Sequence, residues 1–327
     1  MRALYVPLWF RIKTMDRSIY SIEEQDILAN CNLCPRECSV NRFEGGNGYC
    51  GMDAGFNIAS ICVHRGEEPV ISGPDGICNI FFSGCNLHCI FCQNHEISRP
   101  DLGYNKTAMS LDEVLDRVEE ILKTGIKAVG FVSPSHVVPQ VKAIIRGLNE
   151  RGLMPITVYN TNSYDKPETI ESLDGMIDVY LPDYKYASAS ISSEYSDAED
   201  YPEVALKAIK KMYYQKGSTL PLDKEGRAEN GMLIRHLVLP GQIEESKKVL
   251  RSIADDLSTG VHLSLMSQYN PTQFVKYHLR LSRTLYKEEY EMVAEAMENL
   301  GFRNGWIQDL ESYRNYRPDF SKENPFE

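Results

Sequence analysis

The sequence predicts an α/β fold: a partial (β/α)6 barrel with a small N-terminal cysteine-rich, metal-binding region. From residue 78 onward, short apolar runs alternate with amphipathic helical stretches, which is typical of a parallel sheet covered by helices. Residues 31–62 are instead rich in Cys, Gly and Asn. Their few apolar groups cannot bury much of a core, so a metal is expected to hold this part together. A doubly wound sheet is the alternative architecture.

Six strands are expected in the barrel, and the helices between them carry clear end signals. Ser110 and Glu113 form a capping box, and Gly125 ends that helix. Residues 218–231, polar with two glycines, predict an exposed loop or hairpin. The expected strands are 79–83, 128–133, 156–160, 177–181, 233–239 and 261–266. Further helices are expected near 139–152, 169–173, 202–215 and 244–257, and after Tyr286.

The chain divides by composition into four parts. These are an N-terminal extension (1–26), the cysteine-rich region (27–77), the barrel (78–285) and a C-terminal helix and tail (286–327). Four aromatic residues of the tail are expected to cover the open barrel, namely Trp306, Tyr313, Tyr316 and Phe320.

The composition excludes several classes of function. Of 327 residues, 43% are hydrophobic and 25% charged, as in ordinary globular proteins. The net charge of -11 disfavours a non-specific nucleic-acid binder or a binder of anionic membranes. No apolar run reaches the roughly 18 residues of a membrane helix, and no signal peptide is recognisable. A cytoplasmic protein is expected, whose 9 cysteines are metal ligands or free thiols rather than disulfides.

Three cysteines directly after the first barrel strand form the most informative motif. Cys85, Cys89 and Cys92 are spaced C-x3-C-x2-C, with Phe91 just before the last. Three thiolates satisfy three irons of a 4Fe-4S cluster and leave the fourth iron open. The alternative is a structural zinc knuckle with His88 or His95 as its fourth ligand.

This spacing in this place resembles the radical S-adenosylmethionine (SAM) superfamily. The resemblance implies a radical SAM barrel and a cluster whose open iron binds SAM. One electron then cleaves SAM to methionine and a 5′-deoxyadenosyl radical, which abstracts hydrogen from a substrate. It also implies that Phe91 packs near the adenine of SAM. The equally supported alternative is that the Phe91 side chain is simply part of the hydrophobic core.

Three further motifs are similar to those of pyruvate formate-lyase activating enzymes and their uncharacterised relatives, over about residues 31–269. They are residues 160–164 (Asn-Thr-Asn-Ser-Tyr), 178–185 (Asp-x4-Asp-x-Lys in this chain) and 234–241 (Ile-Arg-His-Leu-Val-Leu-Pro-Gly). Tyr269 also has a counterpart. The resemblance implies SAM or substrate contacts for Asn162, Asp183, Lys185, Arg235 and His236, with Lys185 meeting the SAM carboxylate or ribose.

Two departures from the family pattern stand out. Radical SAM enzymes usually carry Gly-Gly-Glu after strand two, whereas this chain has residues 133–136, Ser-Pro-Ser-His. The hydroxyls of Ser133 and Ser135 and nearby backbone oxygens could accept hydrogen bonds from the SAM amine, but no carboxylate is present. Asn160 replaces an Asp that helps to hold a monovalent cation in the activating enzymes, which puts a cation site at Asp183 in doubt.

A second set of cysteines precedes the barrel. Cys31, Cys34, Cys38 and Cys50 supply four thiolates, enough for a mononuclear zinc or iron site or for an auxiliary 4Fe-4S cluster. The mononuclear site is preferred because the repeated C-x2-C-x2-C of ferredoxins is missing. Cys62 and Cys78 are expected to be buried without a ligand role. Residues 64–69 (His-Arg-Gly-Glu-Glu-Pro) are expected to form a surface turn, and contact with the cluster region is the alternative.

The predicted function is therefore that of a radical SAM oxidoreductase. Its expected partners are SAM and a flavodoxin- or ferredoxin-type reductant, and the resemblance adds a glycyl-radical enzyme as the protein to be activated. Radical modification of a small molecule or a peptide is the alternative within this class. A non-enzymatic iron–sulfur electron carrier is the alternative outside it, and it would neither bind nor cleave SAM.

Overall fold

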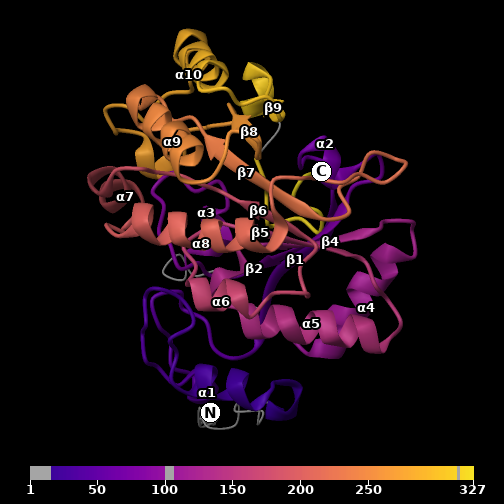
Figure 1. Ribbon diagram of the computed structural model, residues 1–327. Helices are drawn as coiled ribbons and strands as arrows, with labels where there is room; N and C mark the ends of the chain where they lie inside the picture. Colours follow the sequence, from indigo (N-terminus) through magenta and orange to yellow (C-terminus); the bar gives the residue numbers. More distant parts are fainter. Residues whose placement is uncertain (1–15, 100–106, 315–316) are drawn as a thin grey trace.

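The computed structural model describes residues 16–99, 107–314 and 317–327. Its centre is one sheet of nine strands in the order β3-β1-β2-β4-β5-β6-β7-β8-β9 (Figure 1). The strands are β1 (Phe56–His64), β2 (Ile77–Phe82), β3 (Thr107–Met109), β4 (Ala128–Val132), β5 (Ile156–Thr161), β6 (Val179–Pro182), β7 (Gly231–Leu237), β8 (His262–Met266) and β9 (Gly305–Ile307).

From β2 onward every strand pair is parallel, and the strands follow one another in chain order. A doubly wound sheet would reverse its order at a switch point, so the predicted α/β class with a singly wound parallel sheet is confirmed. The six predicted strands correspond to β2, β4, β5, β6, β7 and β8, with ends that differ by up to two residues.

Three strands lie outside the prediction. β1 pairs antiparallel with β2 and with β3, and a register irregularity between Ile58 and Ser60 interrupts its alternation. β9 adds only three residues beside β8. The first strand along the chain, β1, therefore lies inside the region that the sequence assigns to metal binding, and the last strand, β9, lies in the C-terminal tail.

The longer helices of the barrel connect successive parallel strands. Arg146 of α5 binds Glu24 of α1 at 2.8 Å, which holds the N-terminal helix beneath α5 (Figure 1). The α-helices are α1 (Ile22–Ala29), α2 (Pro69–Ser72), α3 (His95–Ser98), α4 (Leu111–Leu122), α5 (Val138–Glu150), α6 (Pro167–Glu171), α7 (Ala189–Ser196), α8 (Tyr201–Lys216), α9 (Ile243–Asp256) and α10 (Lys287–Asn299). The capping box of Ser110 and Glu113 opens α4 as predicted, and a bridge between Leu222 and Ala228 makes residues 218–231 a hairpin.

The C-terminal tail packs against the first parallel strands. Phe320 lies edge-on to Phe81 of β2, with ring centroids 5.5 Å apart, and it also joins a cluster with Val132 of β4. Phe326 contacts Phe81 and His64. The tail therefore covers part of the sheet, as expected for Phe320, and Trp306 packs from β9 beside His262. Tyr316 lies outside the described residues.

No helix among the described residues is long and apolar enough to span a membrane.

Cys62 and Cys78 are buried in β1 and β2, as predicted.

Candidate active site

The loop after β2 carries Cys85, Cys89 and Cys92 at the carboxyl end of the parallel sheet. Cys85 is buried, and the other two are half-buried. Gly84 opens the loop at a φ of 75°, and a Cβ there would lie 2.3 Å from the carbonyl oxygen of Cys50. Only glycine satisfies both conditions, so this residue fixes how the loop leaves the strand.

Every sulfur of this loop accepts a hydrogen bond. Cys85 Sγ accepts from the backbone N–H of Leu87 and from Asn162 Nδ2, both at 3.4 Å. The Ser196 hydroxyl donates to Cys89 Sγ at 3.0 Å. The remaining sulfur, of Cys92, accepts from Ser98 Oγ at 3.5 Å.

These donors fit three thiolates of an iron–sulfur cluster. Hydrogen bonds to cluster sulfurs stabilise their negative charge and tune the reduction potential. Without a metal, burial and the neighbouring Cys89 raise the pKa of the Cys85 thiol to about 12. Ligation requires deprotonation, so metal binding here would release protons. Among the residues that the structure describes, no three Cys, His, Asp or Glu side chains are placed to hold a single metal ion.

A network of buried charges lies beside the loop. Asp183 accepts from Lys185 Nζ at 2.6 Å and from Arg235 Nε at 2.8 Å. Arg235 also binds Glu67 at 3.0 Å and lies 3.9 Å from Glu68. The structure thus brings together three predicted contact residues, Asp183 and Lys185 from the segment after β6 and Arg235 from β7.

Glu67 and Glu68 correct the prediction of a surface turn. Their side chains are only 9% and 8% exposed, and Glu67 Oε1 accepts hydrogen bonds from Asn79 and Asn160. A run of charged residues is usually solvated, but here Arg235 supplies the counter-charge that permits burial. Pro69 begins α2 directly after these two residues.

Burial and charge pairing shift the pKa values of the side chains in this network in opposite directions. Burial alone would raise the pKa of Asp183, but Arg235 and Lys185 outweigh it and hold that pKa below its usual value. Burial likewise favours neutral Lys185, yet Asp183 and Cys89 raise its pKa. Both groups are therefore charged at neutral pH. Glu68 is dominated by burial, which raises its pKa.

Arg235 also explains the departure at Asn160. Its NH2 group donates to Asn160 Oδ1 at 2.6 Å while Nε binds Asp183. A guanidinium therefore already joins the two side chains between which the resemblance would place a monovalent cation.

The residues after β4 and β5 are tied to one another. Ser133 has a φ of 50°, and its N–H donates to the Asn160 carbonyl at 2.7 Å. The Ser135 hydroxyl is fully buried, 2.9 Å from Thr161 Oγ1. Asn162 reaches from β5 to Cys85, so it supports the cluster loop directly.

Two predicted contact residues are buried among core groups. Phe91 lies edge-on to Tyr195 and Tyr269, with centroids 6.4 and 5.9 Å away. His236 alternates with Arg235 along β7, and its two ring nitrogens meet the Tyr184 carbonyl and the Ser246 hydroxyl. The structure thus separates His236 from the charged network.

Tyr201 is a positioning residue that the sequence analysis missed. Its hydroxyl accepts from the Lys185 N–H at 3.0 Å, and it lies 2.9 Å from the carbonyl oxygens of Asn162 and Asp183. One side chain of α8 thereby fixes the backbone of the segments after β5 and β6. No motif in the sequence around this tyrosine indicated the role.

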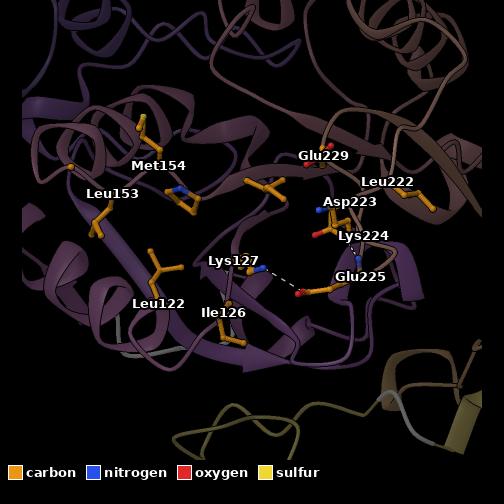
Figure 2. Close-up of a pocket in the computed structure, with 13 residues that line it drawn as sticks. Leu122, Ile126, Lys127, Leu153, Met154, Leu222, Asp223, Lys224, Glu225 and Glu229 are labelled. Atoms are coloured by element: carbon orange, nitrogen blue, oxygen red, sulfur yellow. Dashed lines mark hydrogen bonds and ion pairs between the residues drawn. The ribbon is translucent and has the colours of Figure 1, made fainter.

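A hollow of about 800 Å³ lies elsewhere, at the opposite end of the strands (Figure 2). Lys127, just before β4, faces Glu225 of the hairpin at 3.3 Å across it. Ligand sites of parallel α/β folds lie beyond the carboxyl ends of strands, so this hollow does not belong to the candidate active site.

Comparisons with known proteins agree with this geometry. Residues 79–219 match the family model of the Radical SAM superfamily. An uncharacterized protein of Methanocaldococcus jannaschii is 28% identical over 284 residues, an alignment that covers 84% of this chain and 76% of the relative.

Two solved structures are similar to this chain at low identity, and one of them has a TM-score above 0.5. The FeFe-hydrogenase maturase HydG of Carboxydothermus hydrogenoformans has a TM-score of 0.52 and 12% identity, covering 73% of this chain and 55% of HydG. SuiB of Streptococcus suis with bound S-adenosylmethionine has a TM-score of 0.49 and 13% identity, covering 70% and 49%. The chain thus spans about half the length of these structures.

Proposed function

From the premise that residues 79–219 form a radical SAM domain, we propose that the chain cleaves SAM reductively at a cluster held by Cys85, Cys89 and Cys92. The observation that carries the proposal is the set of three sulfurs on one loop, each with its own hydrogen-bond donor. When bound, a 4Fe-4S cluster would supply one electron to the SAM sulfonium, giving methionine and a 5′-deoxyadenosyl radical for hydrogen abstraction.

The chain's own residues would hold SAM beside this loop. Lys185 is charged, 19% exposed in its side chain, and anchored by Asp183, so it can receive the SAM carboxylate with little reorganisation. Asp183 is in turn held by Arg235, which keeps the Lys185–Asp183 pair in one orientation. Asn162 donates to Cys85 Sγ and fixes the loop against β5.

Activation of a glycyl-radical enzyme is the finer form of the proposal. It is supported by the resemblance of residues 160–164 and 178–185 to the activating enzymes, because the structure brings Asn162, Asp183 and Lys185 to one end of the sheet. Radical modification of a small molecule or peptide remains the alternative within the same chemistry.

Anaerobic reconstitution with iron and sulfide tests the proposal. The reduced protein is incubated with dithionite and SAM, and 5′-deoxyadenosine is measured by mass spectrometry. We expect its formation, and a candidate glycyl-radical enzyme added to the reaction should acquire an organic radical visible by electron paramagnetic resonance. An iron–sulfur protein that binds no SAM and forms no 5′-deoxyadenosine would instead be an electron carrier.

A further inference from the structure

The four N-terminal cysteines form a second thiol cluster outside the proposed SAM site. Cys31, Cys34 and Cys50 are buried and Cys38 is half-buried, in a segment whose one regular element is the short 3-10 helix Arg42–Glu44. The Arg42 guanidinium contacts the sulfurs of both Cys31 and Cys50, which brings these two side chains together although they lie far apart in the sequence.

Each of these sulfurs also has a hydrogen-bond donor. Arg42 Nε donates to Cys31 Sγ at 3.1 Å, and its NH2 group donates to Cys50 Sγ at 3.5 Å. Cys38 Sγ accepts from the Tyr49 N–H at 3.3 Å. The backbone N–H of Arg36 donates to Cys34. This arrangement parallels the loop of Cys85, Cys89 and Cys92.

Arg42 is the unusual member of this cluster. Its side chain is among the largest that are fully buried, and the residue is only 2% exposed. Within the described part of the chain no carboxylate pairs with it; its partners are the two sulfurs and the His136 carbonyl. Burying a guanidinium without an anion costs several kcal/mol, and the side chains in contact with Arg42 that could carry a negative charge are those of Cys31 and Cys50.

We propose that Cys31, Cys34, Cys38 and Cys50 bind a second metal centre as thiolates, and that Arg42 is the positioning residue that balances its charge. Four adjacent thiolates carry too much negative charge for one arginine, and a thiophilic metal supplies the rest. A single Zn²⁺ or Fe²⁺ and a 4Fe-4S cluster share this chemistry, and metal analysis separates them.

The second centre is docked directly on the loop of the first. The Cys50 carbonyl packs on Gly84, next to Cys85. Arg36 Nε donates to the Asn86 carbonyl at 3.0 Å, and the Tyr49 ring stacks on His88 at 4.0 Å. Arg42 binds the turn after β4 through the His136 carbonyl at 2.7 Å. The metal would therefore stabilise one wall of the active site.

The test uses the full chain with Cys85, Cys89 and Cys92 all changed to Ala, which removes the proposed SAM cluster. We expect about one Zn or Fe per chain without sulfide for a mononuclear site, or about four Fe with sulfide for a cluster. A further Cys50→Ala change should abolish this metal, whereas Cys62→Ala, a buried thiol outside the set, should leave it. Cys38→Ser, at the half-buried position, should also lose metal and guards against misfolding of the buried variants.

No bound metal in the triple variant, or metal retained after both Cys50→Ala and Cys38→Ser, would overturn the proposal. Because the SAM cluster is absent from this background, the result is independent of the proposed function.

Arg42 is tested by its spectroscopic effect on the centre. In the triple variant, Arg42→Met should weaken metal retention against a chelator about 10–100-fold, and it should shift the thiolate-to-metal charge-transfer band measured with Co²⁺ or reconstituted iron. Arg42→Lys keeps the charge and should restore part of both. An unchanged band and unchanged retention in Arg42→Met would show that Arg42 only fills space.

Discussion

The two cysteine regions place their sulfurs by different means. Cys85, Cys89 and Cys92 follow β2, and neutral donors from neighbouring segments hold their sulfurs. The second set lies where strands are missing among residues 30–55, and a buried arginine donates to two of its sulfurs. A parallel sheet can position ligands before the metal arrives, whereas a loop segment needs the metal to hold its own shape.

The largest expected effect that tests the difference between the two cysteine regions is the loss of SAM cleavage when one proposed cluster ligand is removed. Cys89→Ala leaves one iron without its ligand, so we expect 5′-deoxyadenosine formation to fall by on the order of a thousandfold or more. Metal at Cys31, Cys34, Cys38 and Cys50 should persist, as measured by metal analysis. If Cys89→Ala still made 5′-deoxyadenosine after anaerobic reconstitution, the assignment of the SAM cluster would be wrong.

The second largest expected effect is a loss of local stability in residues 31–55 when their metal is removed. Removing the metal, by chelation or by Cys34→Ser, should release residues 31–55, because few apolar groups offset their ordering entropy. Hydrogen exchange should show protection there falling by about 2 kcal/mol or more, while β4 to β8 keep theirs. Equal loss of protection in both regions would mean that the sheet also depends on this metal.

The parallel strands were predictable because strands buried on both faces are nearly continuous apolar runs. β4 and β5 therefore begin at the predicted residues. β1 escaped notice because Asn57, Ser60 and the bulge between Ile58 and Ser60 break its pattern. β9, three residues long, is too short to show any period.

The sequence predicted only those parts of the candidate site whose residues lie close together along the chain. The spacing of Cys85, Cys89 and Cys92 needs no partner to be recognised. Glu67 was placed in a surface turn and Arg42 was not singled out, because their partners are distant in the sequence. Arg235 lies 168 residues from Glu67, and the His136 carbonyl lies 94 residues from Arg42. Long-range pairing of charges leaves no periodic signal.

A smaller expected effect, on SAM affinity, distinguishes a lysine that contacts SAM from a lysine that contacts the cysteine-rich region. Lys185→Ala should weaken SAM binding about 10–100-fold, since a hydrogen bond to a charged group is worth about 1.5–3 kcal/mol. The absorption spectrum of the cluster should not change, because Lys185 supplies no thiolate. Lys166, which pairs with Glu37 at 2.7 Å, is the matched control. Lys166→Ala should leave SAM affinity unaltered, and equal affinities in a titration of both variants would remove Lys185 from the site.

The smallest effect concerns the junction between the two regions. His136 is fully buried there, its Nε2 lies 2.9 Å from the Ser83 carbonyl, and its own carbonyl accepts from Arg42. Burial lowers the pKa of His136 from 6.5 to about 4, and nearby Arg42 adds to this. The unfolded chain therefore takes up a proton at a higher pH than the folded chain, so stability falls as the pH is lowered from about 6.5 towards 4.

His136 should thereby cost about 1 kcal/mol of unfolding free energy between pH 6.5 and pH 5.5. Buried His236 has the same lowered pKa, but it lies between β7 and α9, away from the cysteine-rich region. His136→Gln and His236→Gln should each remove a similar share of the pH dependence measured by denaturant unfolding. Hydrogen exchange tells them apart: acid should loosen residues 31–55 in His236→Gln as in the parent, but less in His136→Gln. If acid loosened those residues equally in both variants, His136 would not couple the two cysteine regions.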